Sequence, residues 1–524
     1  MENTILGTSA HAEGNTLADN NTSQASVLLK SILNRKDLVL FHDEQGNGYI
    51  SLEISGHREV HPCKSKTIRT WISREIYLAQ KKAPNSETIK SILSVLEGKA
   101  RFEGQKIELQ NRVAWKDDNL WYDLTNETWQ AIRIDRNDWK LVNEPPILFK
   151  RYSHNKPQIV PEKNGKVDLI LDYVNITNPE HRLLFLVFLV SAFVPNFPHV
   201  ALIIFGAQGS SKSTLSKLTR LVVDPSLIDV ASFPHGQKDL VQTLDHHYFI
   251  FFDNVSYISE EESDTLCKAI TGGGHATREL YSDDEDIIRN FKRIIGINGI
   301  NLVTTRPDLL ERSLLLQLER IDPSKRKTEA KLYKDFERDL PLILGGIFDT
   351  LTKSIEIKPT IELDFHNRMA DWALWGCAIA KALGHTKEEF LTAYKNNISQ
   401  QTEILLNENI VATAVMMLME NREDWEGTAT ELLVALGNEA FESIDTHDKY
   451  WPKAANTLSR KLNELSTPLK QLGIKMTMST SSKGRYIKIE KTPDYKVFQK
   501  DLDDIDDNIL KSSDSEIGHQ EPIF

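Results

Sequence analysis

The residues best suited to chemistry lie in one short loop, Gly206-Ala207-Gln208-Gly209-Ser210-Ser211-Lys212-Ser213-Thr214. An apolar run of strand length, 200–205, precedes the loop, and a helical pattern, 214–222, follows it. This order lets backbone N–H groups and a helix N-terminus surround a phosphate. The loop is therefore predicted to bind a nucleotide, with Lys212 on its β- and γ-phosphates and Ser213 on Mg²⁺. Ser211 stands where the strict pattern has glycine, and an ordinary strand-to-helix turn is the alternative.

A second apolar strand, 248–252, ends in Asp253-Asn254. A carboxylate at the tip of a buried strand is suited to hold Mg²⁺ through water, so Asp253 is predicted to share the metal with Ser213. Asn254 stands where many such ATPases have an acid, and an amide orients a water without accepting its proton. Three acids at 260–262 either replace that acid or cap the next helix. The pattern supports nucleotide binding more directly than hydrolysis.

A third apolar strand, 293–298, ends in Asn298, whose amide is predicted to contact the γ-phosphate or the attacking water. Arg312 follows 14 residues later, just before a fourth apolar strand. Such an arginine can reach the nucleotide of a neighbouring subunit and stabilise developing charge there. Arg306 is the alternative for this role. Equally open is a salt bridge between Arg312 and a nearby acid, Asp308 or Glu311.

The order of these motifs, together with Thr271-Gly272-Gly273-Gly274 and Asn298-Gly299, resembles the superfamily 3 helicases of the AAA+ class. The similarity is strongest to the helicase portions of phage, plasmid and integrative-element primase-helicases. The resemblance implies an ATPase that uses ATP and Mg²⁺. It also implies a homo-oligomeric ring, usually hexameric, with nucleotide sites between subunits and single-stranded DNA in the central channel.

The resemblance further implies a DNA-gripping hairpin between the second and third strands, in residues 268–290. Its candidate DNA contacts are Lys268, His275 and Arg278. An acidic run at 283–286 weakens this interpretation, and a histidine such as His275 also suits a turn or a packing position.

These motifs need elements to position them, and 524 residues suffice for three or four domains. We predict an α/β fold: a P-loop AAA+ ATPase core flanked by a mixed α+β N-terminal domain and a C-terminal winged-helix-like domain. The predicted divisions are a flexible tail 1–27, the N-terminal domain 28–155, the ATPase 156–345, a helical segment 346–403, the winged-helix-like domain 404–492 and an acidic disordered tail 493–524.

In the N-terminal domain, the runs 38–42 and 49–54 flank a Gly-Asn-Gly turn and predict a β-hairpin. Helical patterns follow at 66–80 and 86–97. Five of the nine tryptophans lie in this domain, where they either stack on bases or pack a small sheet. The clustered acids and histidine motif of a primase are not visible.

At the C-terminus, helical patterns at 429–436 and 456–465 precede two runs, 473–475 and 484–489, that predict a two-stranded wing. Residues 451–491 hold nine basic residues against two acidic ones, which favours contacts with duplex DNA phosphates. The predicted DNA contacts are Arg460, Lys461, Lys483 and Arg485. A protein–protein module is the alternative.

The formal charge of −12 argues at first against a nucleic-acid binder. Eight acids and one base fall within 501–524, however, so much of this negative charge belongs to the C-terminal tail.

The start of the chain does not read as a signal peptide, and the most apolar run, 183–194, is too short to span a bilayer. The three cysteines are far apart, which does not fit a disulfide scaffold or a usual zinc site. We expect a cytoplasmic protein.

The sequence thus predicts an ATP-dependent DNA helicase or translocase, a ring-forming replicative helicase of a mobile genetic element or phage. An initiator or helicase loader that binds ATP without unwinding DNA is the first alternative. A nucleotide-gated defence or regulatory ATPase is the second, although no effector domain is visible.

Overall fold

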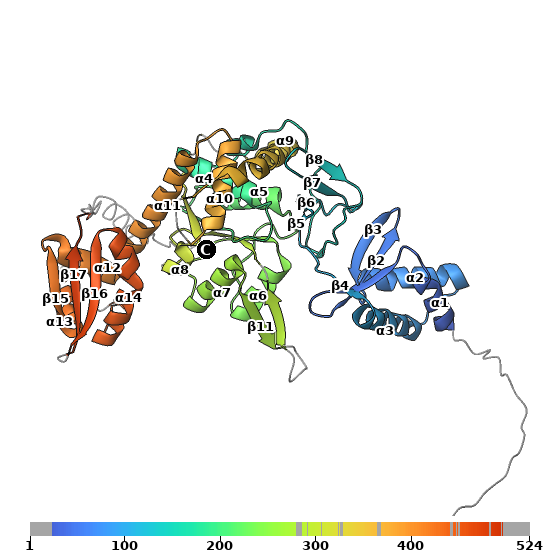
Figure 1. Cartoon of the computed structure of the whole chain (residues 1–524), viewed down its shortest axis with the longest axis horizontal. Helices are drawn as coiled ribbons and strands as arrows, with labels where there is room; N and C mark the ends of the chain where they lie inside the picture. The colour runs from blue at the N-terminus through green and yellow to red at the C-terminus, as the bar shows by residue number, and fades with distance from the viewer. Residues whose placement is uncertain are drawn as a thin grey trace, which may run out of the picture.

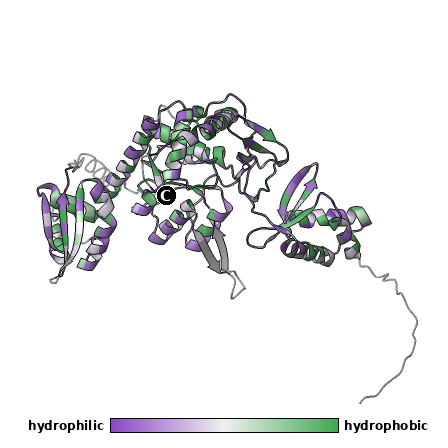
Figure 2. Cartoon of the chain, in the orientation of Figure 1, coloured by the Kyte–Doolittle hydropathy of each residue, from purple (hydrophilic) through white to green (hydrophobic). Residues whose placement is uncertain are grey.

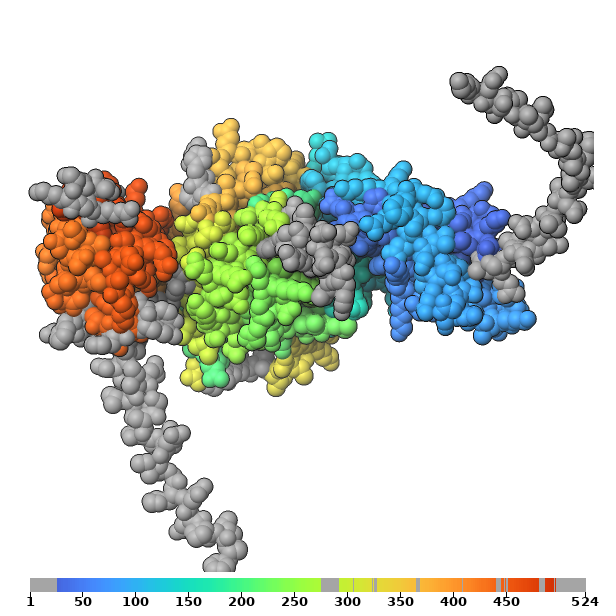
Figure 3. All heavy atoms as spheres, turned by 90° about the horizontal axis from the view of Figure 1, so that it is seen from below, coloured from blue at the N-terminus to red at the C-terminus, as the bar shows by residue number. Residues whose placement is uncertain are grey.

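The computed structural model describes residues 24–493 and 495, with gaps at 279–285, 291, 305, 323, 325–327, 364–367, 441–443, 447, 449–450, 482–483 and 494. Helices and strands alternate along the chain, and several sheets form, which makes the fold mixed α/β. Two views show three bodies in a row: residues 24–106 at one end, 410–491 at the other, and the rest between them (Figures 1 and 3).

The first body is a sheet covered by helices. The predicted hairpin is confirmed, since β1 (Val39–His42) pairs antiparallel with β2 (Gly48–Ile54). The sheet order is β3-β2-β1-β4, with β3 at His57–Pro62 and β4 at Gln105–Lys106. The helices are α1 (Gln24–Leu33), α2 (Lys66–Gln80) and α3 (Ser86–Phe102). Figure 2 shows hydrophobic and hydrophilic residues together on these helices, as one buried and one exposed face require.

A second sheet follows in the order β5-β6-β7-β8. Its strands are β5 (Val113–Lys116), β6 (Asn119–Asp123), β7 (Ala131–Ile134) and β8 (Trp139–Val142). One face of this sheet belongs to the core of the central body, whereas residues 28–100 have a core of their own. The predicted domain 28–155 therefore does not have a single core of its own. Of its tryptophans, Trp71, Trp121 and Trp139 are buried by packing, and Trp115 is 42% exposed.

The central body is built on a parallel sheet in the order β10-β13-β9-β14. Its strands are β9 (Ala201–Phe205), β10 (Phe249–Phe252), β13 (Ile294–Asn298) and β14 (Ser313–Gln317). They are almost wholly buried, as expected for continuous apolar runs in a sheet covered on both faces. Ala231 adds an isolated parallel bridge to Phe252 at the β10 edge.

Helices cover this sheet and fill the body around it. They are η1 (Val167–Asp172), α4 (Pro179–Ser191), α5 (Lys212–Val223), α6 (Gln237–His246), α7 (Glu260–Thr271), α8 (Pro307–Leu310), α9 (Glu329–Ile357), η3 (Lys358–Thr360) and α10 (Ala370–Ala382). The apolar run predicted as a buried helix is α4, which is buried from Leu183 to Ser191. Helix α9 crosses position 346, where the predicted helical segment begins.

The third body follows the order α12 (Ile410–Glu420), β15 (Asp424–Thr428), α13 (Ala429–Ala440), α14 (Ala455–Gln471), β16 (Ile474–Ser481) and β17 (Gly484–Lys491). The predicted pair β16/β17 forms an antiparallel hairpin, and β15 adds a third strand beside β17. Strand β15 was not predicted, because Asp-Trp-Glu-Gly-Thr lacks the apolar alternation of a strand.

Helix α11 (Lys387–Glu408) connects the central body to the third body. Near its middle, the Asn397 amide donates to the Leu315 carbonyl and accepts from the Leu315 N–H, so it pairs with the backbone of β14. Thr402, further along α11, donates to the Gln471 side chain at the end of α14 over 2.5 Å.

Among the described helices, none alone is long and apolar enough to cross a membrane. The pair 387–407 and 410–420, joined at a 92° bend, passes this test together by length and composition only.

Candidate nucleotide-binding site

The loop after β9 needs glycine at two positions. Gly206 has a φ of 145°, and a Cβ there would lie 2.2 Å from the carbonyl oxygen of Leu318. Gly209 has a φ of 84°, in the region that other residues rarely adopt. Ser211 also has a left-handed φ, 66°, and its side chain does not cap the helix that follows. Ser211 thus adopts the backbone conformation for which glycine is usual at this position.

Helix α5 begins at Lys212, immediately after the loop, and the Leu215 N–H bonds the Ser211 carbonyl. The N–H groups of the first turn therefore point out of the helix end, where the helix dipole also favours an anion. The Lys212 ammonium lies inside the loop, 2.7 Å from the Gly206 carbonyl and 3.0 Å from that of Ala207. Burial lowers the pKa of Lys212, and the charge of Asp253 opposes this shift.

The two predicted metal-binding residues lie together. The Ser213 hydroxyl, in the first turn of α5, donates a hydrogen bond of 2.9 Å to the Asp253 carboxylate, just past the end of β10. Strand β13 separates β10 from β9, so two parallel strand ends and one helix start converge here. Within the described residues no group of three or more His, Cys, Asp or Glu forms a metal site.

Asn298, the last residue of β13, is only 1% exposed. Its side-chain oxygen accepts from the Asn254 N–H over 2.9 Å, and its side-chain nitrogen donates to the Ser216 hydroxyl over 2.8 Å. Both amide atoms are thus engaged inside the chain rather than presented to the loop. Asn298 fixes the Asn254 backbone, whose φ is 54°, relative to α5, while Asn254 itself is exposed.

Two of the three acids at 260–262 make side-chain contacts within the chain. Ser259 and Glu262 form a reciprocal capping box at the start of α7, which is the capping alternative from the sequence. Glu260 lies 3.0 Å from the guanidinium of Arg306. In the described contacts, Glu260 and Glu262 are therefore bonded to other residues, and neither contacts Asn254.

The arginine predicted to act between subunits is paired within its own chain. The Arg312 guanidinium contacts the Asp308 carboxylate at 2.8 Å and the Asp308 carbonyl at 2.6 Å. Arg368 also pairs with Asp308, and with Glu311 at 2.9 Å. Burial raises the pKa of Asp308, but the hydrogen bonds from Arg312 and Arg368 outweigh it and lower the value to about 2. Within a single chain, Arg312 therefore forms the salt bridge with Asp308 that was the alternative to a role at a neighbouring nucleotide.

The predicted hairpin between the second and third strands is present. Strand β11 (Gly274–Arg278) pairs antiparallel with β12 (Asp286–Asn290), and the hairpin extends away from the central body (Figure 1). Lys268 lies in the last turn of α7, beside this hairpin. His275 and Arg278 lie on β11, but their side chains are outside the described part, as is the acidic segment 283–285.

In the third body, two of the predicted DNA contacts lie on α14: Arg460 is exposed and Lys461 half-buried. Arg485 lies on β17 opposite Thr480, with its side chain outside the described part, and Lys483 is outside it altogether. The wing also carries Lys475 and Lys488, which both pair with Glu490, at 3.2 and 2.7 Å.

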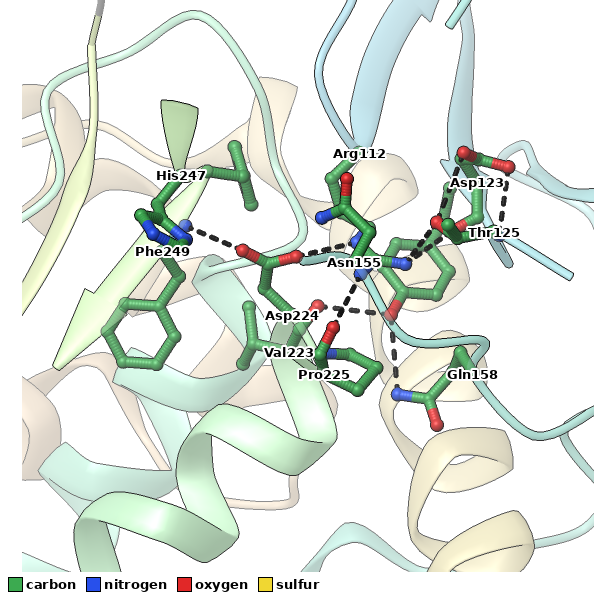
Figure 4. A network of polar contacts seen from close by, with 12 residues as sticks. Arg112, Asp123, Thr125, Asn155, Gln158, Val223, Asp224, Pro225, His247 and Phe249 are labelled. Atoms are coloured by element: carbon green, nitrogen blue, oxygen red, sulfur yellow. Dashed lines mark hydrogen bonds and ion pairs between the residues drawn. The ribbon is translucent and has the colours of Figure 1, made fainter. Parts of the chain in front are cut away.

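A buried polar network at the far end of α5 was missed by sequence analysis (Figure 4). Asp224 accepts from the Arg112 Nε over 2.8 Å and from the Phe249 N–H over 3.2 Å. Its second oxygen lies 3.7 Å from Arg220, which donates to the His247 Nδ1 over 2.9 Å. The network joins the sheet β5–β8, helix α5 and strand β10.

The electrostatics of this network follow from its burial. Burial raises the pKa of Asp224, but Arg112 and Arg220 outweigh it and lower the value. Burial and the Arg220 charge lower the pKa of His247 to about 3, which agrees with a neutral ring that accepts from Arg220. Because Arg112 and Asp224 are 112 residues apart, no local spacing could have revealed the pair.

Comparisons with known proteins point to one type of protein. Residues 167–403 match the family model of an actinomycete integrative conjugative element replication protein, and residues 411–502 match that of the AICE RepA C-terminal domain. A search of curated proteins finds no match.

Three similar solved structures are forms of one apo protein region, the NrS-1 C terminal region. They are 11%, 12% and 11% identical to this chain, with TM-scores of 0.40, 0.36 and 0.38. Each alignment covers 89% of this chain and 98% of the other. Because these TM-scores lie below 0.5, we draw no conclusion about function from them.

Proposed function

Starting from its similarity to the replication proteins of actinomycete integrative conjugative elements, we propose that this replication protein is an ATP-driven DNA helicase or translocase. The observation that carries the proposal is the Ser213–Asp253 hydrogen bond beside Lys212. It joins the hydroxyl and the carboxylate that a Mg²⁺–ATP complex requires, at the start of a helix and the ends of parallel strands. We assign a P-loop AAA+ core to the central body on this basis.

In this proposal the chain's own residues act as follows. The N–H groups of 206–214 and the Lys212 ammonium bind phosphate oxygens, and Ser213 and Asp253 hold Mg²⁺, directly and through water. Bound ATP supplies the hydrolysable γ-phosphate. The exposed Asn254 side chain orients the attacking water, and Asn298 fixes the Asn254 backbone. When a ring assembles, Arg312 leaves Asp308 and contacts the nucleotide of the neighbouring subunit. Arg306 is the alternative for this role.

The DNA contacts follow from the other elements. The hairpin β11/β12 is proposed to face single-stranded DNA in the channel of a hexameric ring. The order helix, strand, two helices and a two-stranded wing in 410–491 supports a winged-helix domain, with α14 and the wing on duplex phosphates. Arg460 is exposed on α14, where such a contact requires it.

The second candidate is an initiator that binds ATP and DNA and assembles without unwinding. Asn254 favours it, because an amide cannot remove the proton of the attacking water. Neither Glu260 nor Glu262 stands in for the missing acid in the described contacts.

The test compares DNA-stimulated ATP hydrolysis and strand displacement by wild type and Lys212→Ala. Lys217→Ala is the matched control, since Lys217 lies on the same helix and pairs with Glu329 at 3.7 Å. Hydrolysis and unwinding that disappear only in Lys212→Ala support the helicase. ATP binding and assembly without unwinding support the initiator. Hydrolysis that does not respond to DNA would refute both.

A further inference from the structure

The body formed by residues 24–106 has a charge opposite to that of the whole chain. It contains 14 basic and 9 acidic residues, whereas the chain as a whole has 63 basic and 75 acidic ones. It also lies outside both family matches, which begin at residue 167. The family matches therefore say nothing about the role of its basic residues.

Helix α2 concentrates exposed basic residues on one face. Lys66, Thr70, Arg74 and Tyr77 recur at spacings of four, four and three, which places them along one side of the helix. All four are exposed, with 67% of the Arg74 side chain and 54% of Tyr77 accessible. Lys81, at the C-cap, extends the row by one more exposed cation.

The cations of the neighbouring helix are neutralised, and those of α2 mostly are not. On α3, Lys90 pairs with Glu87 at 3.0 Å, and Lys99 pairs with Glu103. The α2 helix has one acid, Glu75, on the side away from Lys66, although it reaches Arg74 at 3.4 Å. In the described part of the chain, Lys66 and Lys81 make no ion pair. The exposed face of α2 therefore keeps its positive charge.

We propose that the exposed face of α2, consisting of Lys66, Arg74, Tyr77 and Lys81, binds the phosphate backbone of DNA. This rests on the proposed function in DNA replication and adds a contact surface to it. A row of 15 residues is about 23 Å long, and duplex DNA offers one phosphate charge per ~1.7 Å of its axis, so three cations can each reach a phosphate. The Tyr77 ring provides a flat surface for a sugar or an unpaired base.

A membrane surface would also attract a basic helix, but α2 does not suit it. A helix that lies on lipid inserts an apolar face into the bilayer. The apolar face of α2, formed by Ile68, Trp71, Ile72 and Ile76, is at most 6% exposed, because it packs in the core of its own body. The exposed face of α2 thus offers cations and the Tyr77 ring, and a row of cations suits the phosphate backbone of DNA.

The experiment uses the full chain and measures its affinity for a duplex oligonucleotide by fluorescence anisotropy between 50 and 200 mM salt. The test variant is Lys66→Ala/Arg74→Ala/Lys81→Ala, and the control is Lys90→Ala/Lys99→Ala on α3. Since each duplex phosphate contact contributes about 0.9 to the slope of log K against log salt, the test variant should lose roughly 2.7 and the control much less. Thermal melting and DNA-independent ATP hydrolysis should match wild type.

A test variant with wild-type affinity and slope would overturn the α2 surface and leave the proposed function intact. Wild type that binds no DNA would instead overturn the proposed function. Phosphatidylserine vesicles provide the last comparison: if the triple variant loses vesicle binding and retains DNA binding, α2 is a lipid-binding surface and the proposal is wrong.

Discussion

Replacement of Asp224 by Asn is expected to destabilise the central body by about 1 kcal/mol more than replacement of its partner Arg112 by Met. Two buried guanidinium groups share this carboxylate, since the side chains of Arg112 and Arg220 are 1% and 2% exposed. Asp224→Asn leaves two buried cations without an anion. Arg112→Met leaves Arg220 and Asp224 as a balanced pair. Asp224→Asn should therefore lose more unfolding free energy than Arg112→Met, because it leaves unpaired buried charge.

The size of the effect follows from the contacts. Removing one partner of a buried ion pair costs about 3–5 kcal/mol. Arg112 keeps its hydrogen bonds to the carbonyls of Asp123 and Pro225 in Asp224→Asn, which puts the loss near the lower end, at about 3 kcal/mol. Arg112→Met leaves the carbonyls of Asp123 and Pro225 without this donor, for a loss of roughly 2 kcal/mol. The double variant should lose less than the sum, by at least about 1 kcal/mol.

The assay is urea unfolding at pH 7, followed by tryptophan fluorescence, for wild type, both single variants and the double variant. The exposed pair Glu87–Lys90 supplies the control, because Glu87→Gln should hardly move the unfolding midpoint. If Arg112→Met costs more than Asp224→Asn, or if the two losses simply add, the network does not depend on a shared buried charge.

Two further outcomes are expected. Ser211→Gly should keep nucleotide binding and raise stability by up to about 1 kcal/mol, because glycine adopts a φ of 66° without strain; a lower melting temperature than wild type would contradict this. Burial lowers the pKa of His154 to about 4 and those of His199 and His247 to about 3. Below pH 6.5 the unfolded chain therefore binds more protons than the folded chain, so the unfolding free energy should fall as the pH falls. The slope should reach up to about 2.7 kcal/mol per pH unit from the buried His199 and His247, with a smaller contribution from the half-buried His154; equal stability at pH 7 and pH 5 would refute it.

The elements of the central sheet were predictable because each strand is an apolar run bounded by polar residues. The strand predicted at 200–205 is β9, and the one predicted at 248–252 is β10. Strands that are buried on both faces show no alternation of polar and apolar residues, so the short length of the apolar run is what distinguishes them from helices. The contact between Ser213 and Asp253 follows from those strand ends.

What could not be predicted depends on long-range packing. The sheet β5–β8 shares its core with the central body, although its sequence is continuous with the N-terminal body. Asn298 was expected to face the phosphate, but its burial and its two hydrogen bonds depend on Ser216, 82 residues away. Arg312 is held by Asp308, one of the two acids that the sequence left open. The positions of the sheet and of Asn298 are not encoded in local spacing, whereas the Arg312–Asp308 pair spans only four residues and was one of the open alternatives.

Helix α11 makes the central and third bodies mechanically continuous. Its Asn397 is held by the backbone of β14, the strand that follows Arg312, and its Thr402 is held by the end of α14. The two contact residues are five positions apart, roughly 7.5 Å along the helix, so a tilt of about 5° about Asn397 displaces Thr402 by only about 0.7 Å. A shift of β14 along the axis of α11 would therefore reach the end of α14 through about one and a half turns of helix.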